Sequence, residues 1–176
     1  NLAYSLHEGT AATADEKDQA ISTSVTYKGG PVEAAVAYEQ YSEDANRGER
    51  NAVRLAVAYQ VIDPLKLVAI AQTVEHDVNS TLNADLFGFG AEYAITKQTA
   101  VKGMYISRMA EEENYDADML TVGVEHKLDS ALRVYANYAV VMNDENVALN
   151  PWTQARTTNA PAVIGEDASG LSVGLR

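Results

Sequence analysis

The decapeptide AVRLAVAYQV at residues 52–61 alternates between large apolar side chains and smaller or polar ones. In an extended chain, successive side chains point to opposite sides. One face would then hold five apolar side chains, namely Val53, Leu55, Val57, Tyr59 and Val61. The other face would hold Arg54 and Gln60 together with three alanines. This period of two residues predicts a β-strand with a single apolar face.

The same alternation recurs along most of the chain and predicts ten strands in all. The other nine have their apolar positions within residues 2–6, 21–27, 32–38, 65–71, 87–93, 101–105, 120–126, 132–138 and 171–175. Short turns are expected at about 28–31, 62–64, 96–98 and 128–130. Longer polar loops are expected at about 8–19, 42–50, 74–84, 109–118 and 142–169. Because every second connection is short, we expect an all-β, up-and-down antiparallel architecture with all short turns at one end.

Composition excludes several classes of protein. With 25 acidic and 13 basic residues, the net charge of -12 argues against nucleic acid as a partner. The chain has no cysteine, which excludes a disulfide scaffold and thiolate metal sites. No run of about 18 apolar residues is present to form a membrane-spanning helix. Eighteen of the acidic residues fall in the five long loops, so the acidity belongs to the loops rather than to the strands.

Ten tyrosines against two phenylalanines and one tryptophan suggest a boundary between water and an apolar phase. On the apolar face, four aromatic or imidazole side chains come just before a short turn and three lie toward the long loops. This predicted girdle comprises Tyr27, Tyr59, Tyr93, His126, Tyr38, Tyr105 and Tyr138. Two such bands around an apolar zone are typical of a transmembrane β-barrel. A soluble sandwich would instead need large apolar groups in a buried core and would have less regular loop lengths.

The opposite face carries alanine, serine, glycine, glutamine and charged residues, and it is interpreted as wet. Its candidate pore-lining residues are Arg54, Lys66, Glu92, Lys102, Arg108, Glu125, Arg133 and Asn137. Their mixed signs are consistent with selection by size and a weak charge preference. An ordinary solvated strand charge is the alternative interpretation for each of them.

Two strings resemble the C-terminal half of Gram-negative general diffusion porins: VGVEHKLDSALRVYANYA at 122–139 and GLSVGLR at 170–176. The resemblance implies a transmembrane barrel of sixteen strands, of which residues 1–176 would supply the last ten as a single partial-barrel domain. The family's closing strand ends in an aromatic residue, whereas this sequence has Arg176. We therefore expect residues 1–176 to be part of a longer chain, without the inward-folded loop that narrows the family's pore.

The resemblance also implies a function. It predicts a bacterial outer-membrane location, long loops facing outward, short turns facing the periplasm, contact with the lipid bilayer and lipopolysaccharide, and a homotrimer. The expected activity is passive diffusion of ions and small hydrophilic solutes, with no cofactor and no catalysis.

Three alternatives remain open at the level of sequence. A closed ten-stranded barrel could serve as an adhesin or receptor, with recognition carried by loop 142–169. An outer-membrane protease has less support, because Asp77 and its neighbour His76 would point to opposite faces of an extended chain. The acidic loops, above all Glu111, Glu112 and Glu113, could bind divalent cations that bridge to lipopolysaccharide, or they could simply be solvated.

Overall fold

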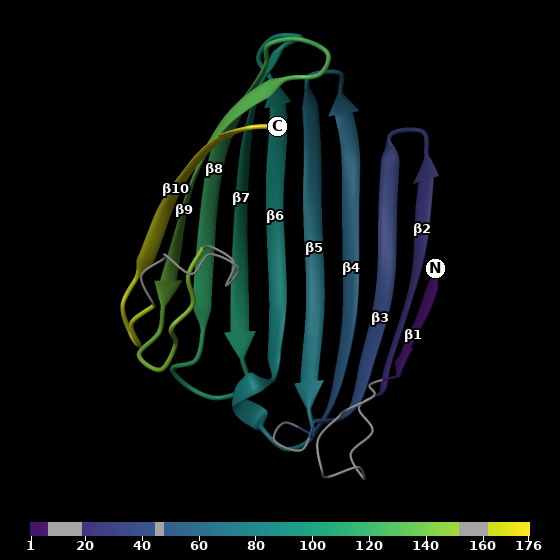
Figure 1. Cartoon of the computed structure of the whole chain (residues 1–176), viewed down its shortest axis with the longest axis vertical. Coiled ribbons are helices and arrows are strands. Elements are labelled where there is room, and N and C mark those ends of the chain that lie inside the picture. The colour runs from purple at the N-terminus through teal and green to yellow at the C-terminus, as the bar shows by residue number, and fades with distance from the viewer. Residues whose placement is uncertain (7–18, 45–47, 152–161) are drawn as a thin grey trace.

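A computed structural model of the protein describes residues 1–6, 19–44, 48–151 and 162–176. Ten antiparallel strands form one sheet in chain order, as Figure 1 shows. The strands are β1 (Leu2–Leu6), β2 (Gln19–Gly29), β3 (Val32–Asp44), β4 (Gly48–Ile62), β5 (Leu65–His76), β6 (Ala84–Ala94), β7 (Thr99–Ala110), β8 (Ala117–Lys127), β9 (Arg133–Asn143) and β10 (Ala168–Leu175). A 3₁₀ turn, η1 (Ser80–Leu82), precedes β6. The predicted all-β, up-and-down topology is confirmed.

Tight turns join alternate strand pairs at one end of the sheet, and local chemistry explains their shape. Gly30, between β2 and β3, has φ +54°, a conformation in which glycine carries no steric penalty. In the turn between β8 and β9, the carboxylate of Asp129 accepts hydrogen bonds from the backbone N–H groups of Ala131 and Leu132. These connections fix the hairpin registers on which the two faces of the sheet depend.

The strands extend further toward the long loops than the sequence pattern suggested. Tyr41 pairs with Arg50, and the β3–β4 ladder reaches Asp44 and Gly48, inside the segment 42–50 that was expected to be a loop. Backbone groups hydrogen-bond across a ladder whatever side chains they carry, so a strand can continue beyond the point where its apolar alternation stops. The predicted loop 8–19 lies outside the described residues, apart from Gln19 in β2.

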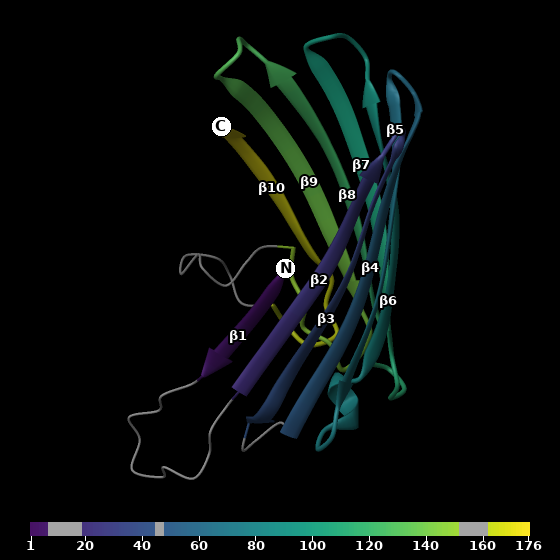
Figure 2. The same ribbon diagram turned by 90° about the vertical axis from the view of Figure 1, so that its right-hand side faces the viewer.

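The sheet is an open trough. Within the described part of the chain, β1 pairs only with β2 and β10 pairs only with β9. Figure 2 shows the sheet curving from one of these edges to the other, so that one face is concave and the other convex. The alternative of a closed ten-stranded barrel requires pairing between β1 and β10, and this structure does not have it.

The sheet buries almost no hydrophobic core. Among the described residues the buried apolar side chains are Ala52, Ala117, Val141 and Val147. Large apolar residues are instead exposed, as with Phe89 at 66% and Val173 at 73%. This arrangement is inside-out relative to a water-soluble domain, and contact with lipid is the environment that makes it favourable.

No helix in the described ranges has both the length and the apolar character needed to cross a membrane.

Candidate pore wall

Strand pairing sorts the predicted site residues onto two faces, because side chains directly opposite each other across a ladder point the same way. Lys66 pairs with Glu92, which pairs with Lys102, and the same face continues through Gly123 to Asn137. All eight candidate pore-lining residues lie on this face: Arg54, Lys66, Glu92, Lys102, Arg108, Glu125, Arg133 and Asn137. The girdle candidates lie on the other face: Tyr27, Tyr38, Tyr59, Tyr93, Tyr105, His126 and Tyr138.

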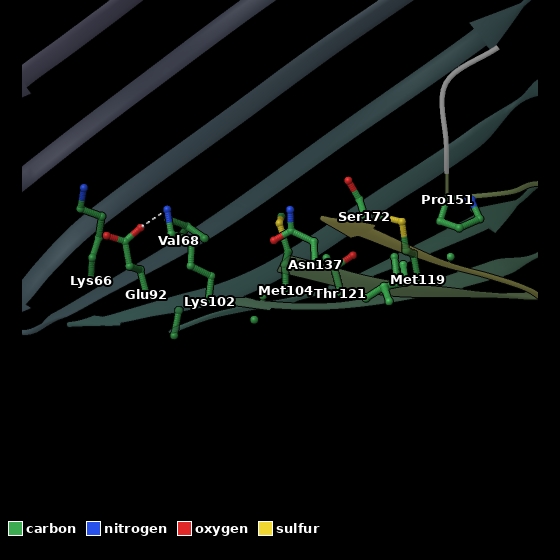
Figure 3. A pocket seen from close by; sticks show the side chains of 16 residues that line it. Lys66, Val68, Glu92, Lys102, Met104, Met119, Thr121, Asn137, Pro151 and Ser172 are labelled. Carbon is green, nitrogen blue, oxygen red and sulfur yellow. Dashed lines mark ion pairs between the residues drawn. The ribbon is translucent and has the colours of Figure 1, made fainter. Parts of the chain in front are cut away.

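The charged face is the concave one. A cavity of about 660 Å³ is lined by residues of β5 to β10, including Lys66, Lys102, Asn137 and Ser172. A convex surface cannot bring six successive strands around one cavity, so these side chains occupy the inside of the trough. Figure 3 shows Lys66, Glu92 and Lys102 projecting to the same side of the strands.

One ion-pair network lies near the turn end of β6 to β10. Lys102 Nζ is 3.1 Å from a carboxylate oxygen of Glu92 and 3.8 Å from one of Glu125. Arg133 Nη1 donates to Glu125 at 2.9 Å, and Arg176 donates to the other carboxylate oxygen. Glu125 is only 8% exposed, so three cations surround one nearly buried carboxylate. Four of these residues were among the predicted pore-lining candidates, but the sequence did not indicate that they contact one another.

A second network lies toward the loop end of β3 to β5. Glu39 accepts from Arg54 at 2.8 Å and from Arg50 at 3.3 Å, and Arg54 Nε donates to Gln72 at 2.6 Å. The guanidinium of Arg50 stacks 4.1 Å from the ring centre of Tyr41. Only Arg54 was among the site candidates. Strand alternation alone places Glu39 on this face, and the same signal could have found Tyr41 and Gln72, whereas Arg50 was missed because it fell in a predicted loop.

The remaining candidates take different positions on the wall. Arg108 is half-buried and donates through Nη1 to the backbone carbonyl of Tyr115 at 2.5 Å. Lys66 and Asn137 line the same cavity as Lys102. Lys66 forms no ion pair with any carboxylate of the described residues. Its ammonium interacts with Glu33 through charge alone, without a direct ion pair.

Part of the concave wall is apolar, which corrects the interpretation of this face as uniformly polar. Side chains of β5 and β7 approach two glycines of β6 from either side. A Cβ added to Gly88 would lie 2.9 Å from Ile70 and 3.1 Å from Ile106. A Cβ added to Gly90 would lie 3.2 Å from both Val68 and Met104. These four side chains, with Met119 of β8, form what we call the apolar patch.

The described start of the connection between β9 and β10 also lies against the concave wall. Asn143 accepts from the N–H of Leu149 and donates to the carbonyls of Leu149 and Glu166. Val147 is 6% exposed and packs with Ala117 and Val141. Pro151, a few residues on, lines the same cavity as Lys102. The side chain of Asn143 thus holds this segment beside the apolar patch.

The convex face combines apolar side chains with polar anchors near the loop end. The hydroxyl of Tyr38 donates to Asn51 and that of Tyr105 donates to Asp118, each at 2.8 Å. Near the turn end, His126 Nδ1 lies 2.8 Å from the Thr99 hydroxyl. An aromatic ring on a lipid-facing strand with a hydrogen-bonded polar tip is the geometry expected at a membrane interface.

Several acidic loop residues are hydrogen-bonded within the protein. Glu111 accepts from the Asn83 side chain and Glu112 accepts from the Ser80 hydroxyl. Asp116 accepts from the backbone N–H of Ala110. No group of three or more histidine, aspartate or glutamate residues in the described ranges is arranged to hold a metal ion.

Comparison with known proteins identifies the family. Residues 1–146 match the sequence family described as Gram-negative porin. The chain belongs to the Gram-negative porin family. No curated protein matches the porin chain. Membership of this family places the porin in the outer membrane of a Gram-negative bacterium, as the sequence predicted.

Solved structures share the porin's fold at low sequence identity. An anion-selective porin from Comamonas acidovorans superposes with a TM-score of 0.76 at 23% identity, covering 89% of this chain and 48% of that one. OmpT, an outer membrane protein of Vibrio cholerae, gives 0.67 at 14% identity, covering 99% and 62%. The NanC porin gives 0.59 at 10% identity, covering 90% and 78%. The chain thus spans about half the length of the Comamonas porin.

Proposed function

We propose that this porin forms a water-filled channel through which ions and small hydrophilic solutes diffuse passively, with a preference for anions. The observation that carries the preference is an excess of cations among the described strand residues of the concave face and the adjoining Arg176. The cations there are Lys28, Arg50, Arg54, Lys66, Lys102, Arg108, Lys127, Arg133 and Arg176. The carboxylates there are Glu33, Glu39, Glu92 and Glu125.

A net positive wall raises the local concentration of anions in the water beside it. Rings and rows of charged side chains tune ion selectivity in this way in other pores. One structural neighbour is described as an anion-selective porin, which supports the same preference. Passive diffusion involves no chemical step.

The resemblance to general diffusion porins supports a homotrimer in contact with lipopolysaccharide. We also propose that divalent cations bridge the acidic loops to lipopolysaccharide. Measuring the stability of the protein with and without added calcium tests this bridge.

Planar lipid bilayers test the proposal. In potassium chloride we expect stepwise currents, and across a salt gradient the reversal potential should favour chloride over potassium. The preference should be stronger at 0.1 M salt than at 1 M, because the Debye length falls from about 10 Å to about 3 Å. A silent membrane would contradict the channel and favour the adhesin, and a preference for potassium would contradict the role of the wall charges.

Two single-charge substitutions on the wall sharpen the test. Glu125→Gln removes a carboxylate from among three cations and should increase the preference for chloride. Arg54→Gln removes a cation from the other network and should decrease it. The two variants change the charge of the wall by one unit in opposite directions. Each therefore serves as the control for the other.

A further inference from the structure

The cavity on the concave wall combines two kinds of surface that a simple water-filled channel does not need together. Its floor is built from the apolar patch, through Val68, Met104 and Met119. Lys66 and Lys102 stand at its turn-end side. Figure 3 shows the two lysines at one end of the cavity and Met119 toward the other, near Pro151. An apolar floor beside cationic groups is the surface of an amphipathic binding site.

The apolar floor is built into the fold. Gly88 and Gly90 leave space on β6, and side chains from β5 and β7 fill that space from both sides. Any larger residue at Gly90 would place its Cβ 2.6 Å from the backbone carbonyl of Gly103. The glycines therefore maintain a smooth apolar surface across three strands of the inner wall.

The charged side chains that line the cavity are two cations and one carboxylate, Lys66, Lys102 and Glu92, which leaves one net positive charge for an anion. Lys102 is shared between Glu92 and Glu125, whereas Lys66 has no ion pair with a carboxylate anywhere in the described ranges. Asn137, Thr121 and Ser172 add polar groups along the wall. A volume of about 660 Å³ lies in the range of small-molecule binding sites.

We propose that this cavity is a binding site for organic anions that carry an apolar body, such as aliphatic or aromatic carboxylates, on their way through the channel. The carboxylate pairs with Lys66 and Lys102, and the apolar body lies on Met104, Met119 and Val68. Flexible, polarisable methionine side chains suit bodies of different shape. Chloride gains nothing from the patch, so the site discriminates among anions by their apolar part. This inference rests on the proposed function.

Current measurements with benzoate and acetate as probes test the site. Both ions carry one carboxylate, and they differ in apolar area. We expect benzoate to halve the chloride current at a concentration about tenfold lower than acetate, given the additional apolar area that benzoate removes from water. Equal block by the two probes in a conducting channel would overturn the site and leave the proposed function standing. If no chloride steps were observed, both proposals would fail.

Variants assign the effect to the two parts of the site. Met104→Gln should bring the benzoate and acetate concentrations closer together, with block measured against that variant's own chloride current. Met104→Leu keeps the apolar surface and should preserve the difference. Lys66→Gln should weaken block by both probes to a similar extent. A benzoate preference that survives both Met104→Gln and Met119→Gln would show that the apolar patch does not bind the probe.

Discussion

The two faces of the same ten strands differ in how uniform they are. The convex face repeats one chemistry from β1 to β10, with apolar side chains along the strands and the girdle side chains near the ends of several of them. The concave face is divided into the Glu125 network, the Glu39 network and the apolar patch. A bilayer requires only one property of the surface it touches, whereas a channel wall acts on solutes through its local differences.

The largest expected effect comes from placing a charge on the convex face. Leu55→Arg puts a cation among the lipid-facing residues near the middle of β4 and should cost about 2–4 kcal/mol of folding free energy in a bilayer. Ala56→Arg, the next residue, places the same cation on the concave face and should cost far less. Equilibrium refolding into phospholipid vesicles measures both. Equal losses would show that the two faces have been assigned the wrong environments.

A smaller effect is expected from filling the glycine gap beneath the apolar patch. Gly90→Ala brings a Cβ within 2.6 Å of the Gly103 carbonyl, and we expect a loss of about 1–3 kcal/mol. The control is Gly103→Ala on the convex face, where the nearest atom to the new Cβ is the Thr121 carbonyl at 3.8 Å. Denaturant midpoints in the same detergent compare the two variants. An unchanged midpoint for Gly90→Ala would mean that β6 and β7 can move apart at this position without loss of folding free energy.

The smallest effect should come from Asn143, which holds the β9–β10 connection against the wall. Asn143→Ala removes three hydrogen bonds to the backbone of Leu149 and Glu166. Since one hydrogen bond contributes about 1 kcal/mol, loss of the bond donated by the Leu149 N–H alone should make exchange of that amide hydrogen about fivefold faster. Asn143→Asp keeps the acceptor for the Leu149 N–H and should fall in between. An unchanged exchange rate in Asn143→Ala would show that this side chain does not hold the β9–β10 connection against the wall.

The faces were predictable from sequence because a strand has a period of two residues. The alternation that puts Leu55 and Arg54 on opposite sides holds for every strand, whatever its neighbours are. The contacts on the concave face were not predictable in the same way. Alternation places Val68 and Ile70 on the same side as Lys66, but the sequence LKLVAIA at 65–71 does not indicate an apolar patch there. Their position across Gly88 and Gly90 from Met104 and Ile106 depends on the strand register at β6, which no local sequence pattern contains.

The Arg176–Glu125 contact has a consequence for how the last strand joins the sheet. The backbones of Arg133 and Arg176 exchange two hydrogen bonds, and both side chains reach Glu125 on β8. A β10 strand that paired two residues out of step would keep its apolar side outward and most of its ladder. It would, however, carry Arg176 away from Glu125. The ion pairs to Glu125 thus stabilise the observed register over an alternative that would bury the same apolar surface.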